Sequence, residues 1–170
     1  MIGRFKKLLA KRAKRYFELG GKLFNDDKYN DAIDSYTKAI KLDPTYSSAY
    51  FNRSLCFAQK REYEKASRDL LMVMKFEPNS FDAPYVMGLI SERKEDFETA
   101  LKWYDESIKK NPNYSRAIEV RGKLREKIFI EKFYQMMKLC QGDLDWKIAT
   151  QGGNVWEIRR HDWALREEDM

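Results

Sequence analysis

The sequence predicts an all-α protein built of stacked helix pairs. Proline recurs at Pro44, Pro78 and Pro112, a period of 34 residues. Self-similarity at a fixed period indicates a solenoid, in which one repeat cannot bury its apolar face alone and must stack on the next. The 8 glycines and 4 prolines are too few for a loop-rich β protein. The same period is kept by Ala32, Ala66 and Ala100 and by Tyr29, Tyr63 and Phe97.

Each repeat is expected to hold two helices. In the first repeat, apolar residues three and four positions apart form one stripe up to Leu23, and a second stripe follows the polar run NDDK. Small residues fall where the two helices must approach closely, at Gly20, Ser54 and Gly88 in the first helices and at the three alanines in the second. The prolines end each second helix, because proline cannot continue a helix and disfavours helical geometry in the residue before it.

These patterns resemble the tetratricopeptide repeat. That family's pattern places a large residue before Leu-Gly, and later Ala, an aromatic residue, Ala and Pro; the runs YFELGGKLF and YNDAIDSYTKAIKLDP match it closely. The second repeat departs from the pattern at Arg53 and Val73, and the third at Pro84, which fits a helix only in its first turn. The resemblance implies a right-handed helical solenoid of three repeats. We place them at 13–46, 47–80 and 81–114.

A concave face lined by the first helix of each repeat is the binding surface that the resemblance implies. Its positions are mostly apolar and aromatic, so we expect them to hold an apolar or helical segment of a partner. Asn52 is suited to hold a peptide backbone through two hydrogen bonds. The alternative is that some of the aromatic residues only pack inside the array. The positions are Phe17, Gly21, Phe24, Phe51, Asn52, Leu55, Gln59, Tyr85, Leu89 and Arg93.

A soluble co-chaperone that binds an acidic peptide C-terminus is the first rival function. In one branch of the family, a clamp of Lys, Asn, Asn, Lys and Arg grips the C-terminal carboxylate of heat-shock chaperones. Only Asn52 fits that clamp, which argues against this function. The corresponding positions are Phe17, Gly21, Asn52, Asp82 and Val86.

After the repeats, we expect a capping helix over residues 115–141. Its first half resembles the polar helix that closes such arrays. In its second half apolar residues nearly encircle the helix, which indicates that it is buried under the tail or under another protein. Phe133, Met136 and Met137 are its candidate partner contacts, because methionine adapts to irregular surfaces.

The tail, residues 142–170, holds three of the four tryptophans. Tryptophan in a polar segment is typical of an anchor at a protein interface. The alternative is that the tail folds back and covers the capping helix or fills the groove. The three candidate anchors are Trp146, Trp156 and Trp163.

The N-terminal arm, residues 1–12, carries most of the excess charge. Residues 1–15 hold seven bases and no acid; the whole chain has a net charge of +6, so the remainder sums to −1. The segment is also amphipathic, so it could lie on an anionic membrane, dock on an acidic protein or RNA surface, or serve as a targeting presequence. The alternative is a solvated start of the first helix. The bases of the arm are Arg4, Lys6, Lys7, Lys11 and Arg12.

No catalytic, cofactor-binding or metal-binding pattern is found in the sequence. There is one histidine, His161, and there is no phosphate-binding glycine motif and no Cys–His cluster. We therefore expect no enzyme activity, no cofactor and no small-molecule substrate. Nucleic acid is not an expected partner, because the positive charge is confined to one arm.

The expected function is a non-enzymatic scaffold or adaptor, a structural subunit that forms a hetero-complex with other proteins. A membrane-surface adaptor attached through residues 1–15 is the second rival. Cys56 and Cys140 form no CxxC motif, which suits a reducing compartment, and no window of about 18 apolar residues is present. We expect a cytoplasmic protein, with a ciliary or organelle-associated assembly as the alternative.

Overall fold

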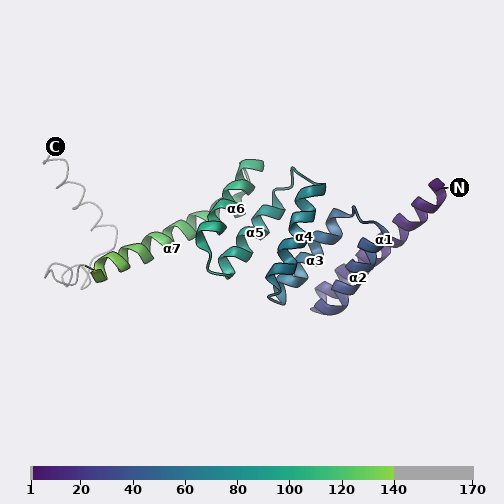
Figure 1. The fold of residues 1–170 in the computed structure, drawn as a ribbon, viewed down its shortest axis with the longest axis horizontal. Coiled ribbons are helices and arrows are strands. Elements are labelled where there is room, and N and C mark those ends of the chain that lie inside the picture. Colours follow the sequence, from purple (N-terminus) through teal and green to yellow (C-terminus); the bar gives the residue numbers. More distant parts are fainter. Residues whose placement is uncertain (1, 140–170) are drawn as a thin grey trace. The chain divides into compact units, whose positions relative to one another are not determined.

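The structure, a computed structural model, describes the backbone of residues 2–139 and the side chains of residues 6–138. This part of the chain forms seven α-helices and no strand, as the sequence predicts (Figure 1). The chain divides into two compact units, Met1–Arg125 and Glu126–Met170. The three predicted tail anchors lie outside the described residues. The helices are α1 (Ile2–Asn25), α2 (Tyr29–Leu42), α3 (Ser47–Gln59), α4 (Tyr63–Phe76), α5 (Asp82–Arg93), α6 (Phe97–Lys110) and α7 (Ser115–Leu139).

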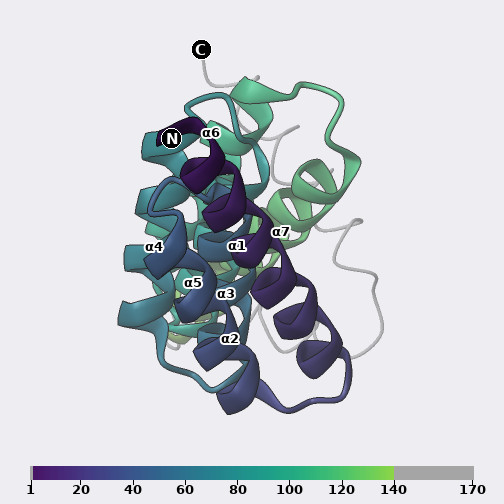
Figure 2. The ribbon, with the colours of Figure 1, turned by 90° about the vertical axis from the view of Figure 1, so that its right-hand side faces the viewer.

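Helices α1 to α6 pack in chain order, and each predicted repeat is one helix pair (Figure 1). Figure 2 shows the first pair, α1 and α2, from the end of the array. In the first and third pairs the two helices approach closely at a glycine. A Cβ atom added to Gly20 would lie 2.6 Å from the ring of Tyr36, and one added to Gly88 would lie 2.4 Å from the ring of Tyr104. Any larger residue would collide with the ring, so the predicted role of these small residues is confirmed.

The turn between the two helices of a repeat has the same backbone in all three repeats. Asp27, Arg61 and Glu95 occupy the same position in successive repeats and have φ angles of 57°, 59° and 61°. The next N–H group in each turn donates to a carbonyl five residues earlier, at 2.9, 2.9 and 3.0 Å. This is the Schellman arrangement, which satisfies carbonyls at the end of a helix and usually has glycine at the left-handed position.

The prolines mark the ends of the second helices, as predicted. Helices α2, α4 and α6 each end two residues before Pro44, Pro78 and Pro112. Pro84 is the third residue of α5, and its side chain is fully buried. Its missing N–H group costs nothing there, because the first turn of a helix has no internal acceptor for it.

A nearly buried ion pair lies within the second repeat, and a hydrogen bond connects it to the first repeat. Arg53 on α3 donates from Nε and Nη2 to the two carboxylate oxygens of Asp69 on α4, at 2.7 and 2.8 Å. Its Nη1 donates to the hydroxyl of Thr37 on α2, at 2.9 Å. The side chains of Arg53 and Asp69 are only 16% and 8% exposed. The departure from leucine at position 53 therefore places a polar bridge between repeats.

Candidate protein-binding face

One row of aromatic residues crosses the first helices of the repeats. Phe17 on α1, Phe51 on α3 and Tyr85 on α5 occupy the same position in successive repeats, and each is half-buried. The ring of Phe17 lies 5.1 Å from that of Tyr46, and the ring of Tyr85 lies 5.2 Å from that of Tyr114, between centroids. The array fixes these rings while part of their surface stays accessible.

A second row lies one turn further along the same helices. Gly21, Leu55 and Leu89 also occupy one position of the repeat, and each is half-buried. Residues four positions apart share one side of a helix, so the two rows form one continuous surface. We call it the aromatic face, and it consists of Phe17, Gly21, Phe51, Leu55, Tyr85 and Leu89.

The other predicted groove residues differ from one another in their surroundings. Phe24 is half-buried and packs on Tyr29, with ring centroids 5.6 Å apart. Gln59 and Arg93 are exposed at the C-terminal ends of α3 and α5. Phe24 thus contributes to the packing of the first repeat, and the two polar residues flank the aromatic face.

The carboxylate-clamp positions do not form a basic pocket. Asn52 hydrogen-bonds the hydroxyl of Tyr36; burial raises the pKa of Tyr36 to about 12, and this hydrogen bond opposes the rise. Asp82 introduces a negative charge, and Val86 is buried. The remaining two clamp positions belong to the aromatic face, so none of the five carries a positive charge.

The aromatic face ends where the repeats end. One repeat period beyond the last members of the two rows lie Glu119 and Lys123 on α7. These two side chains are exposed and form an ion pair of 2.7 Å, and Lys123 lowers the pKa of Glu119 through its hydrogen bond. The apolar surface therefore extends over three repeats and stops at a polar pair.

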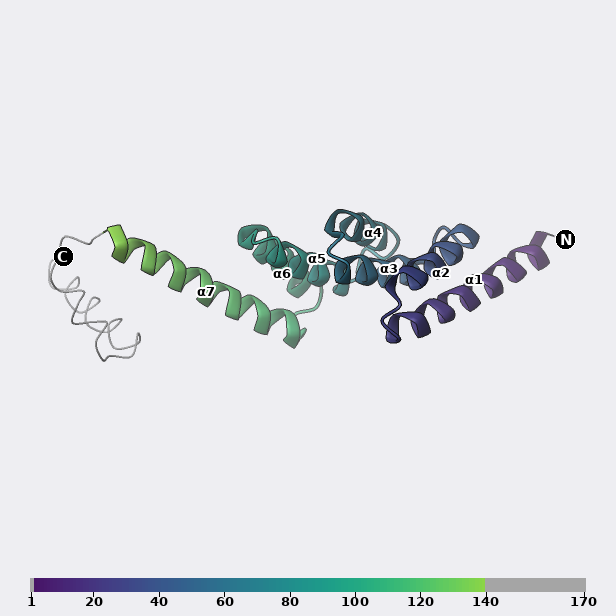
Figure 3. The same ribbon diagram turned by 90° about the horizontal axis from the view of Figure 1, so that it is seen from below.

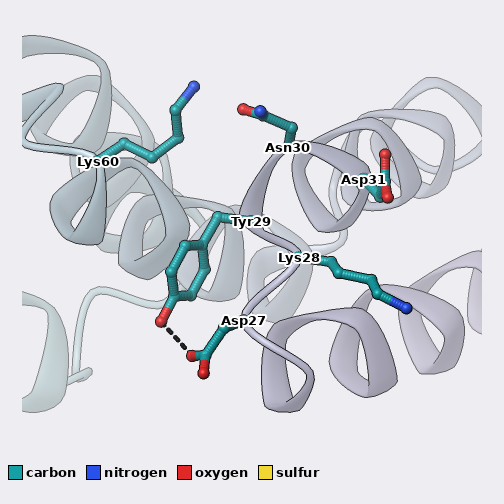
Figure 4. A pocket seen from close by; sticks show the side chains of 6 residues that line it. All are labelled: Asp27, Lys28, Tyr29, Asn30, Asp31 and Lys60. Carbon is teal, nitrogen blue, oxygen red and sulfur yellow. Dashed lines mark hydrogen bonds between the residues drawn. The ribbon is translucent and has the colours of Figure 1, made fainter.

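Outside this face, the structure has a polar hollow at the turn between α1 and α2. In this hollow the hydroxyl of Tyr29 donates to the carboxylate of Asp27, which raises the pKa of Tyr29 (Figure 4). The other lining side chains are Lys28, Asn30, Asp31 and Lys60. Residues 2–139 contain no group of three or more His, Cys, Asp or Glu residues that could hold a metal ion.

The predicted basic arm forms the beginning of α1. Helix α1 runs unbroken from Ile2 to Asn25, and its first turns extend beyond the end of α2 (Figure 3). Ala13 is the first buried residue of the described part. The exposed bases of the predicted arm are Lys6, Lys7, Lys11 and Arg12. The side chain of Arg4 precedes residues 6–138, for which the structure describes side chains.

The second half of α7 presents apolar side chains to solvent. Tyr134 is 58% exposed and Met136 54%, while Phe133 and Met137 are half-buried. The expectation that apolar residues nearly encircle this helix needs correction, because a polar strip runs along one side. The strip consists of Lys127, Glu131, Gln135 and Lys138. Neither α7 nor any other helix in the described part is long and apolar enough to cross a membrane.

Comparisons with known proteins agree with this architecture. The family model described as "TPR repeat" matches residues 13–60. The E3 ubiquitin-protein ligase CHIP of Arabidopsis thaliana is 32% identical over 90 residues, which cover 53% of this chain and 32% of that protein. The Hsp70-Hsp90 organizing protein 1 of Glycine max is 29% identical over 102 residues, 60% of this chain and 18% of that protein.

Solved structures show the same fold. The Arabidopsis OM64 TPR domain has a TM-score of 0.67 and 21% identity, covering 70% of this chain and 98% of that domain. The first TPR of Spaghetti (RPAP3), bound to the HSP90 peptide SRMEEVD, has a TM-score of 0.66 and 24% identity, covering 70% and 94%.

The fold and the repeated surface define an α-helical repeat protein of the solenoid class. Residues 13–60 match the TPR repeat model, and the helix pairs α1 to α6 have the fold of solved TPR domains, with α7 following them. The chain spans a third or less of the length of the two curated relatives described above.

Proposed function

We propose that this protein is a non-enzymatic adaptor that holds an apolar, helical segment of a partner protein on the aromatic face. The observation that carries the proposal is the row of Phe17, Phe51 and Tyr85, which keeps the period of the repeats and stays partly accessible. An amphipathic helix binds such a surface through apolar residues three, four and seven positions apart. We further propose that the protein acts as a subunit of a hetero-complex.

The named relatives favour protein binding in general. The residues of this chain, however, favour an apolar ligand over an acidic peptide C-terminus. The HSP90 peptide in the RPAP3 complex, SRMEEVD, ends in acidic and apolar residues. Here Asp82 would repel such a peptide, and Asn52 already bonds Tyr36. An apolar ligand needs no cationic clamp, so it fits the aromatic face better.

The test is peptide selection followed by measured affinities. A displayed library of helix-length peptides is selected on the full chain, and binding of the selected peptides and of SRMEEVD is measured by fluorescence anisotropy. We expect selected peptides with helical apolar spacing that bind with little dependence on salt. Leu55→Lys or Leu89→Lys should weaken their binding by about tenfold or more, which is at least about 1.4 kcal/mol.

The matched control is Leu71→Lys. Leu71 lies on α4, outside the aromatic face, and is 52% exposed, so the same change there should leave binding intact. Circular dichroism shows whether each variant keeps its helices. Tight, salt-sensitive binding of SRMEEVD that is lost in Asn52→Ala would instead establish the co-chaperone function.

A second function, attachment to an anionic membrane surface, is favoured by the charges of α1. All six bases between positions 6 and 15 are exposed, and the only ion pair among them in the described part joins Lys14 to Glu18 at 3.9 Å. Leu8, in the same segment, is 53% exposed. Basic residues beside apolar ones are typical of helices that lie on anionic lipid.

Flotation of the full chain with phosphatidylcholine vesicles, with and without phosphatidylserine, tests this function. Lys7→Glu with Lys11→Glu should abolish flotation with the anionic vesicles. Lys41→Glu with Lys102→Glu makes the same change of net charge at exposed positions on α2 and α6 and should not. Equal behaviour of the two double variants would contradict the proposal.

A further inference from the structure

Helix α7 repeats a feature of the first helix of each repeat, and no second helix follows it in the described part of the chain. Gly122 continues the series of Gly20, Ser54 and Gly88 at the same repeat period. In the first and third repeats a tyrosine ring from the second helix lies directly over the glycine, but among the described residues nothing lies within 4 Å of a Cβ atom placed on Gly122. α7 therefore presents the side that a second helix covers in a complete repeat.

This side of α7 continues as an exposed apolar surface. Ile118 is 40% exposed, Ile130 38% and Met136 54%. From Ile118 to Met136 is about five turns at 3.6 residues per turn, so these two residues lie on the same side of the helix, and Ile130 lies about a third of a turn away from them. We call this surface the exposed face of α7; it consists of Ile118, Gly122, Ile130, Phe133, Met136 and Met137.

The exposed face differs from the side of α7 that is buried in the array. Ala117 and Leu124 are 0% and 1% exposed. Leu124 and Phe133 are separated by about two and a half turns, so they point to opposite sides of the helix. The exposed face is therefore a separate surface, and contiguous exposed apolar surface is typical of an interaction site.

We propose that the tail, residues 142–170, folds back along α7 and covers the exposed face with its tryptophans. Only two residues separate the tail from the end of α7, and the tail is long enough to reach back along the helix. From Leu139 back to Gly122 is about 26 Å of helix at about 1.5 Å per residue, and the tail spans more than that even when fully helical. The tail also brings Trp146, Trp156 and Trp163, the residue type that buries the largest apolar area.

Charge complementarity favours the tail over a second copy of the chain. Residues 115–139 hold seven bases and three acids, a net charge of +4, whereas residues 142–170 hold four bases and seven acids, a net charge of −3. Tail and helix attract each other, while two α7 helices would repel each other. A partner protein would then have to displace the tail to reach this face.

The test follows the tail tryptophans by fluorescence in the full chain. Trp103→Phe removes the one tryptophan that is not in the tail. In this background we expect a monomer whose acrylamide quenching is severalfold lower than in the urea-denatured chain. Met136→Glu should raise quenching towards the denatured value, whereas Gln135→Glu, the same added charge on the polar strip, should not.

Three outcomes would overturn the proposal. Quenching equal to that of the denatured chain means that the tail covers nothing. Protection that disappears on dilution, with a dimer mass by light scattering, means that a second copy is the occupant. Protection that survives Met136→Glu means that the tail packs elsewhere, for instance on the aromatic face.

Discussion

The guanidinium of Arg53 and the carboxylate of Asp69 form a bidentate ion pair. The other two repeats have an apolar residue at the position of Arg53. The residues at the position of Arg53 are Leu19 in the first repeat and Met87 in the third. Two parallel N–H···O bonds satisfy both carboxylate oxygens, and the third nitrogen is satisfied by the hydroxyl of Thr37. Each charge is tolerated in this nearly buried place because the other is present.

Removing one member of the pair should destabilise the protein strongly. Arg53→Met leaves the carboxylate of Asp69 nearly buried without its cation, and such a loss costs about 3 kcal/mol. Arg53→Met combined with Asp69→Leu removes both charges, and we expect this double variant to be more stable than Arg53→Met alone. Urea denaturation followed by circular dichroism measures the unmodified chain and both variants.

The exposed pair of Arg121 and Asp105 is the control for this prediction. Its atoms are also 2.7 Å apart, but the side chains are 26% and 47% exposed. Arg121→Ala should cost less than about 1 kcal/mol, because water replaces the lost partner. Equal losses in Arg53→Met and Arg121→Ala would show that burial does not govern the first pair.

Two adjacent glycines on α1 should respond oppositely to alanine. A Cβ atom on Gly20 would lie 2.6 Å from the ring of Tyr36, so Gly20→Ala forces the helices apart and should cost about 1–3 kcal/mol. A Cβ atom on Gly21 meets only the hydroxyl of Tyr36, at 3.9 Å. Gly21→Ala should therefore raise stability by up to about 1 kcal/mol through helix propensity. Thermal unfolding of both variants measures the difference.

The repetition explains why so much of this fold could be predicted. The regular period determined the helix pairs, the small residues such as Gly88 and the helix ends before the prolines, because each signal occurs three times. The partner of Arg53 could not be predicted, since nothing local relates it to Asp69 on the following helix. The apolar surface of α7 was predicted to extend nearly all round the helix. This was too broad, because the prediction considered only the apolar residues and not the polar strip that includes Gln135 and Lys138. The binding role of the aromatic face stays a prediction, and the structure adds that Asn52 interacts with the hydroxyl of Tyr36.

The turn residues with left-handed backbone offer a stabilising substitution. The sequence did not predict this conformation, because none of these residues is glycine. Glu95 has a φ of 61°, a conformation that costs a residue with a side chain roughly 1–2 kcal/mol and glycine almost nothing. Glu95→Gly should raise the free energy of unfolding by up to about 1 kcal/mol, since glycine also loses more entropy on folding. Lys102→Gly, at an exposed position inside α6, should lower it by about 1 kcal/mol. Urea denaturation of both variants measures the two changes.

Alkaline pH should destabilise the protein through groups that burial keeps protonated. Burial raises the pKa of the Cys56 thiol from 9.0 to about 11, and that of Tyr36 from 10.0 to about 12. Between the unfolded and folded values, the unfolded chain has released protons that the folded chain still holds. The contribution of these groups to stability is therefore complete below about pH 9 and falls as the pH rises.

Cys56→Ala separates the two contributions to this loss. Without the thiol, the decline between about pH 9 and 10 should shrink, because of the two groups only Cys56 begins to titrate there in the unfolded chain. The decline above about pH 10 should persist, because Tyr36 still ionises first in the unfolded state. Urea midpoints measured from mildly to strongly alkaline pH in both chains test this directly. Parallel curves over the whole range would mean that the buried thiol takes no part in the alkaline loss, and that the cause must lie with the tyrosines or with the lost charges of lysine.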